Sequence, residues 1–205
     1  MRKYGMIEAV LAILSGLAVF AGAAQAQRPL IIVGGLNFAE IEGDDFGDTD
    51  TRTGFRLALG SPFVLSPRLA ITPFVAFTER GYDSGNVSAK ITYIELPVVL
   101  DVAVPLGETF SLNLSVGPRL GFNVGCQIET VNSSFQCDGL PGVGDPETID
   151  YGVIGGAGLG LAISPRLDLG IGAGYDVGFA DVFTQLDGRH RGPLLYAALT
   201  IRSGA

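Results

Sequence analysis

Apolar and polar residues alternate with a period of two along most of the chain after residue 26. In the segment 110–124, every even position is apolar or proline, and the odd positions are Ser, Asn, Gly or Arg119. This alternation predicts a β-strand with one apolar face. Seven further segments follow the pattern: 30–39, 52–60, 68–79, 88–100, 151–163, 166–179 and 193–201. Since no helical period follows residue 26, we expect an all-β chain of about eight strands.

The connections between these segments alternate in length. Long polar connections lie at 40–51, 80–87, 125–150 and 180–192, and short ones lie at 61–67, 101–107 and 164–165. Two of the short connections share the phrase Ser-Pro-Arg-Leu, in which the proline favours a turn. Long loops at one end and short turns at the other are typical of outer-membrane barrels. We therefore predict a closed, antiparallel, up-and-down transmembrane β-barrel.

The composition of the polar face distinguishes a membrane barrel from a soluble one. A soluble lipocalin-like barrel also alternates, but its apolar face points inward. Here the polar face is mostly Gly, Ser, Asn and Ala with isolated charges, whereas a water-exposed surface carries about a quarter or more charged residues. Small residues fit the interior of a narrow barrel, so we expect the apolar face to meet lipid.

The first residues have the form of an export signal. Arg2 and Lys3 precede an uncharged run at 9–23, and Ala-Gln-Ala follows at 24–26. The alternative is a retained anchor helix, but the run is shorter than the roughly 20 residues of a spanning helix. We expect residues 1–26 to be a cleaved signal peptide and residues 27–205 to form the barrel domain.

Charge and cysteine usage agree with an exported protein. The net charge is −8, which argues against a nucleic-acid partner because such a partner requires a basic surface. Cys126 and Cys137 lie in the same long polar connection, and in an oxidising compartment we expect them to form a disulfide at the tip of that loop.

One short phrase carries a resemblance to a known family. The segment 93–97, Tyr-Ile-Glu-Leu-Pro, resembles a strand of the porin-family outer-membrane β-barrel domain, in the broad class of small OmpA/OmpX-like barrels. The resemblance implies eight strands, a location in the outer membrane of a Gram-negative envelope, and insertion by the barrel-assembly machinery. Despite the family label, small barrels of this class are not established wide channels.

Charged residues on the inward face suggest an ion-pair network in the lumen. Charges of both signs in a narrow lumen must pair, because an isolated buried charge costs several kcal/mol. The expected members are Arg52, Arg56, Glu95, Arg119, Asp168 and Asp176. We expect Arg119 to be the first partner of Glu95. Such a network fits a plug of salt bridges better than the alternative, a gate or ion path.

Other motifs indicate no metal site and no cofactor. The first long connection is acidic, but its spacing does not match the EF-hand loop, and an acidic run is usually a solvated face. The carboxylates in it are Glu40, Glu42, Asp44, Asp45, Asp48 and Asp50. The glycine-rich stretches 156–160 and 170–174 open no helix, which argues against nucleotide binding.

Only one histidine is available for catalysis. His190 lies in the fourth long connection near Asp181 and Asp187, and Ser133 and Ser134 lie in the third. We interpret His190 as a solvated loop residue rather than a catalytic base.

The favoured function is therefore non-enzymatic, with a role in structure, envelope integrity or surface interaction. The expected partners are outer-membrane lipid, lipopolysaccharide, the assembly machinery and an extracellular ligand at the long loops. The alternatives are a narrow solute or ion channel and, less favoured, a lipid A-modifying hydrolase.

Overall fold

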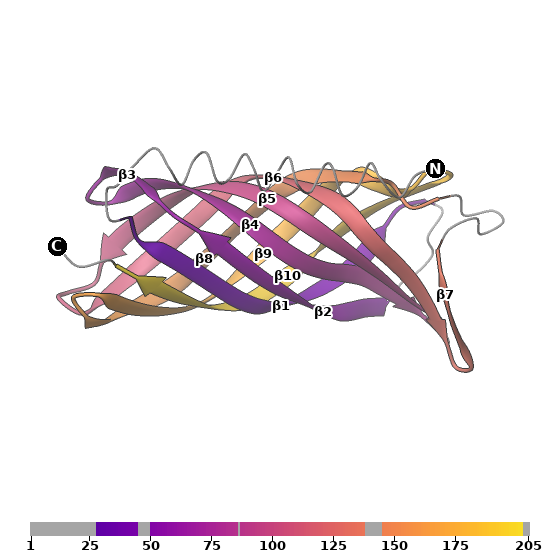
Figure 1. The fold of residues 1–205 in the computed structure, drawn as a ribbon, viewed down its shortest axis with the longest axis horizontal. Coiled ribbons are helices and arrows are strands. Elements are labelled where there is room, and N and C mark those ends of the chain that lie inside the picture. Colours follow the sequence, from indigo (N-terminus) through magenta and orange to yellow (C-terminus); the bar gives the residue numbers. More distant parts are fainter. Residues whose placement is uncertain (1–27, 45–49, 86, 138–144, 203–205) are drawn as a thin grey trace.

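Ten strands form one antiparallel sheet in the computed structural model, which describes residues 28–44, 50–85, 87–137 and 145–202 (Figure 1). The strands are β1 (Leu30–Glu42), β2 (Asp50–Gly60), β3 (Phe63–Ser66), β4 (Leu69–Ser84), β5 (Val87–Pro105), β6 (Phe110–Thr130), β7 (Ser133–Gln136), β8 (Ile149–Ser164), β9 (Leu167–Phe183) and β10 (Leu186–Ile201). Because β1 pairs with both β10 and β2, and β2 pairs with β4, the sheet closes into a ring. Eight strands make up this ring, and the short strands β3 and β7 pair only with β4 and β6.

The predicted strand segments all correspond to strands of the ring, but the real strands extend further, mostly at the end with the long loops. At the other end, β5 continues to Pro105 through most of the predicted turn 101–107. Segments 80–87 and 180–192, predicted as long loops, are mostly strand: β4 and β5 are separated only by 85–86, and β9 and β10 only by 184–185. Polar residues continue the strands past the apolar belt. The predicted strands were too short because we ended them where the hydrophobic alternation ends. The predicted signal peptide, residues 1–26, lies outside the described residues.

The two ends of the barrel differ. One end, called the turn end here, carries the short connections near 61–68, 106–109 and 165–166. The first and last described residues also lie at this end. The Ser61 hydroxyl donates a hydrogen bond to the carbonyl of Pro29, and the Arg202 amide donates one to the carbonyl of Arg166. At the other end, called the loop end, the β6–β7 hairpin projects away from the barrel (Figure 1).

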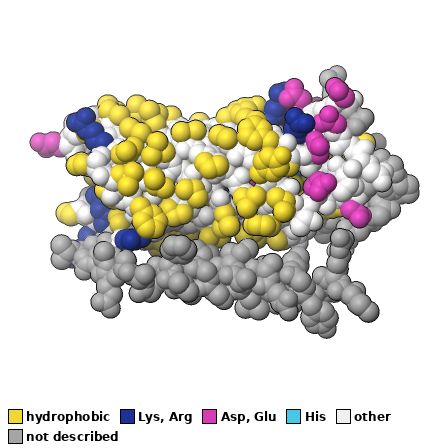
Figure 2. Space-filling model, turned by 90° about the horizontal axis from the view of Figure 1, so that it is seen from above, with side chains coloured by type: hydrophobic (Ala, Val, Ile, Leu, Met, Phe, Trp, Pro, Cys, Tyr) yellow, Lys and Arg dark blue, Asp and Glu magenta, His cyan; other side chains and the backbone are white. Residues whose placement is uncertain are grey.

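Apolar side chains cover the outer wall between the two ends. Leu57, Leu59, Ile171 and Leu195 are between 49% and 67% exposed. Figure 2 shows a belt of hydrophobic side chains on the face in view. Acidic side chains gather at the loop end of this face, with a few basic ones beside them, and basic side chains predominate at the turn end (Figure 2). A belt of this kind bounded by polar rims is the surface of a transmembrane barrel. Among the described residues, no helix has the length and hydropathy of a transmembrane helix.

Candidate functional site

Six charged side chains meet in the middle of the lumen. Each comes from a different strand of the ring, and each residue is at most 7% exposed. They are Arg56 on β2, Arg80 on β4, Glu95 on β5, Arg119 on β6, Asp150 on β8 and Asp176 on β9. We call this set the ion-pair layer. Its three cations and three anions balance, which is what a low-dielectric interior requires.

Glu95 is fully buried on one side of the layer. One carboxylate oxygen accepts a hydrogen bond from Arg56 at 2.6 Å and another from the Thr78 hydroxyl at 2.9 Å. The other oxygen lies 2.6 Å from Arg80 and 3.6 Å from Arg119. This carboxylate therefore contacts all three cations of the layer.

The two aspartates complete the layer on the opposite side. Arg80 lies 2.9 Å from Asp150 and 2.9 Å from Asp176, and Arg119 lies 2.6 Å and 2.7 Å from the same two carboxylates. Each guanidinium therefore bridges two aspartates, which is the geometry of strong charge-assisted hydrogen bonds. Removing one member would leave the layer with one buried charge that is not balanced.

The structure brings together four of the six residues that the sequence indicated: Arg56, Glu95, Arg119 and Asp176. The other two lie elsewhere. Arg52 donates a hydrogen bond to Ser88 at 3.2 Å, nearer the loop end, and Asp168 pairs with Arg202 at the turn end. The choice of Arg119 as first partner of Glu95 was also wrong, because Arg56 and Arg80 both lie closer.

Arg80 and Asp150 were missed because both fell in segments assigned as loops. The alternation contained the signal for them. Arg80 continues the inward parity of Thr72 and Thr78 along β4, and Asp150 precedes the outward Tyr151 at the start of β8.

Between the ion-pair layer and the loop end, the lumen is filled by buried, mostly apolar side chains. This packed cluster consists of Ile41, Ala89, Ile91, Tyr93, Cys126, Ile128, Cys137, Val182 and Phe183. His190 is 1% exposed, and its Nε2 lies 3.3 Å from the Tyr93 hydroxyl. The prediction of a solvated loop histidine was therefore wrong, because β10 extends far enough to point His190 into the barrel.

The disulfide joins Cys126 and Cys137, whose Cα atoms are 5.4 Å apart. It lies at the base of the β6–β7 hairpin rather than at the tip of a loop, and Cys137 is fully buried. The bond therefore ties the projecting hairpin to the packed cluster inside the barrel.

His190 lies apart from the serines and aspartates that the sequence placed near it. Ser133 and Ser134 are exposed on β7, whereas His190 is buried inside the barrel. Asp181 and Asp187 pair with Arg189 at 3.5 and 3.8 Å on the outside. Of the first acidic connection, Asp45 and Asp48 lie outside the described residues. Within the described ranges, no three His, Cys, Asp or Glu side chains converge to hold a metal ion.

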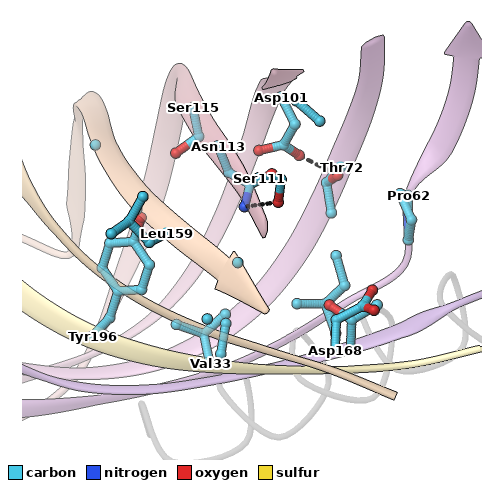
Figure 3. Close-up of a pocket in the computed structure, with 18 of the residues that line it drawn as sticks. Val33, Pro62, Thr72, Asp101, Ser111, Asn113, Ser115, Leu159, Asp168 and Tyr196 are labelled. Atoms are coloured by element: carbon cyan, nitrogen blue, oxygen red, sulfur yellow. Dashed lines mark hydrogen bonds between the residues drawn. The ribbon is translucent and has the colours of Figure 1, made fainter. Parts of the chain in front are cut away.

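Between the ion-pair layer and the turn end lies a cavity of about 580 Å³ (Figure 3). Arg56 lines it on the side of the layer, and the turn residues Arg68 and Gly107 line it at the rim. Figure 3 shows Thr72, Asp101, Ser111 and Asn113 in this cavity together with Tyr196. The lumen is thus filled in its loop half and hollow in its turn half.

A closed antiparallel barrel with an apolar outer belt and a charged interior defines the class of outer-membrane β-barrels. The sequence matches the family model of the outer membrane protein beta-barrel domain over residues 9–190. The chain therefore belongs to this family, and it is a protein of the bacterial outer membrane. No curated protein matches the chain.

Several solved structures are similar to the chain. Neisserial surface protein A (NspA) is 15% identical with a TM-score of 0.54, over 85% of this chain and 97% of its own. Ail, the attachment invasion locus protein of Yersinia pestis, is also 15% identical, with a TM-score of 0.44 over 85% and 99% of the two chains. The outer membrane enzyme PagL is 12% identical, with a TM-score of 0.46 over 82% and 97%. At these identities the likeness to NspA concerns the fold alone.

Proposed function

We propose that this protein is a closed, non-enzymatic barrel that acts in envelope integrity or surface interaction rather than as a channel. The observation that carries the proposal is the filled loop half of the lumen. Together, the ion-pair layer and the packed cluster that includes Tyr93 and Phe183 fill the cross-section of the lumen. An eight-stranded barrel has room for side chains or one small ligand and little else.

Recordings in planar lipid bilayers test the closed lumen. We expect the purified barrel to give no steps of ion conductance. The matched variants are Glu95→Ala, which unbalances the ion-pair layer, and Glu42→Ala, which alters only the exposed rim. Regular conductance steps from the wild-type protein that change with Glu95→Ala and persist in Glu42→Ala would overturn the proposal. They would favour the second candidate, a narrow channel whose inner half is the cavity at the turn end.

The surface role would lie at the loop end. Short turns face the periplasm in barrels of this kind, so the loop end is extracellular. Its rim is acidic (Figure 2), and its described carboxylates include Glu40, Glu42, Asp44, Asp50, Asp83, Glu129, Asp145, Glu147, Asp181 and Asp187. An acidic rim favours a partner with basic groups, and cation bridges to lipopolysaccharide would suit the same carboxylates.

Complementation of a deletion strain distinguishes a structural role in envelope integrity from a role in surface interaction. The test variant has Glu40, Glu42 and Asp44 changed to the corresponding amides. These changes leave the ion-pair layer intact and remove three negative charges from the rim. If this variant restores envelope integrity as well as the wild type does, the role is structural. If it inserts normally but fails to restore the phenotype, the acidic rim is the functional surface.

A further inference from the structure

The cavity at the turn end is unused by the proposed function. Its volume of about 580 Å³ lies within the range of small-molecule sites, roughly 300–1,000 Å³. The lining reaches the rim at Arg68 and Gly107, so the cavity is accessible from the periplasm. A small barrel of this size can hold one small ligand.

The cavity is hollow because the wall formed by β8 and β9 contributes few side chains. Most inward positions of β8 and β9 at this level are glycines, among them Gly158 and Gly172. Tyr196 reaches across from β10 and lies over them: a Cβ at Gly172 would stand 2.4 Å from Cζ of the tyrosine ring. The wall is therefore built to accept one aromatic ring and to leave the remaining space open.

Asp101 gives the cavity its chemistry. Its carboxylate accepts a hydrogen bond from the Thr72 hydroxyl at 2.5 Å, and none of the ion pairs among the described residues includes it. Two other carboxylates line the cavity: Asp168, which pairs with Arg202, and Glu108, which is exposed at the rim. A partly buried carboxylate without a cation favours a ligand that supplies one.

We propose that the cavity binds a small organic cation from the periplasm. A primary ammonium group would donate to Asp101, since it offers three donors in a compact head. Asn113 and Ser111, which lie on the same wall (Figure 3), would stand beside this head. A short apolar portion of the ligand would pack against Val33, Val99 and Leu194. The site does not depend on whether the ion-pair layer conducts, because it is reached from the periplasmic side alone.

The test compares two probes of nearly the same shape, phenethylamine and 2-phenylethanol, on the full barrel in lipid nanodiscs. Binding is followed by NMR shifts of the Thr72 and Asn113 amides. We expect the amine to bind at least tenfold tighter than the alcohol. Asp101→Asn should weaken binding of the amine at least tenfold and leave the alcohol unchanged. Asp44→Asn, at the opposite rim, should change neither.

Three results would overturn this proposal. The first is the absence of saturable shifts with the amine, and the second is equal binding of the amine and the alcohol by the wild type. The third is equal loss of amine binding in Asp101→Asn and Asp44→Asn. The comparison of probes on the wild-type protein decides the question even if Asp101→Asn fails to fold.

Discussion

Replacing Glu95 by alanine should destabilise the barrel more than any change to a rim carboxylate. The substitution leaves three arginines facing two aspartates, and it removes the partner that lies 2.6 Å from both Arg56 and Arg80. Breaking a buried ion pair by removing one partner costs about 3–5 kcal/mol. Truncation of the side chain adds a small void, so we expect the free energy of unfolding to fall by at least about 3 kcal/mol.

The loss can be measured by urea unfolding of the folded barrel in detergent micelles. Far-ultraviolet circular dichroism is the suitable probe because the chain contains no tryptophan. The matched control is Glu42→Ala, whose side chain is 60% exposed and contacts Arg191. An exposed pair is worth about 1 kcal/mol or less. Similar losses for the two variants would refute the reasoning.

A double variant tests the same argument from the opposite direction. Changing both Glu95 and Arg56 to glutamine removes one charge of each sign and keeps the layer neutral. Because the two residues are in contact, their effects should not add. We expect the double variant to lose less stability than the sum of the two single variants, and strict additivity would show that charge balance is unimportant.

Three further outcomes are expected in the same unfolding assay. Cys126→Ser should lower stability by roughly 3 kcal/mol, because the disulfide closes a loop of 11 residues; an unchanged urea midpoint would contradict this. Gly172→Ala should destabilise the barrel because its Cβ would clash with Tyr196, whereas the lipid-facing Gly34→Ala meets nothing within 4 Å and should be nearly neutral. Arg80→Ala should cost about as much as Glu95→Ala, since it leaves three buried carboxylates facing two arginines; a loss below about 1 kcal/mol would show that the layer is not cooperative.

The alternation of side chains predicted the strands and their inward faces, because period two is a direct consequence of strand geometry. It underestimated the strand ends for a physical reason. Apolar residues are required only where a strand meets lipid, and beyond the lipid polar residues form the same ladder. Arg80, Asp150 and His190 all lie on the ring strands outside the segments that the alternation predicted.

The choice of partner for Glu95 could not be made from the pattern alone. In the ladder, Glu95 is opposite Gly121 on β6 and Ala76 on β4, while Arg119 is opposite Pro97. Arg56 reaches Glu95 from β2, which is not adjacent to β5, so this contact depends on the stagger across the intervening strand β4. That stagger is a property of the closed barrel, and no single segment of sequence contains it.

The ion-pair layer draws on β2, β4, β5, β6, β8 and β9, and so it leaves out the two strands that complete the ring. These two strands, β1 and β10, meet along a seam from the Leu30–Ile201 pair to the Glu42–Arg189 pair. A sheet from β2 to β9 that has curled but not yet closed can already carry all six charges as a neutral unit. Closure of the seam therefore need not precede insertion of the ion-pair layer. The first and last strands can join after this layer has entered the bilayer, without moving any net charge through lipid.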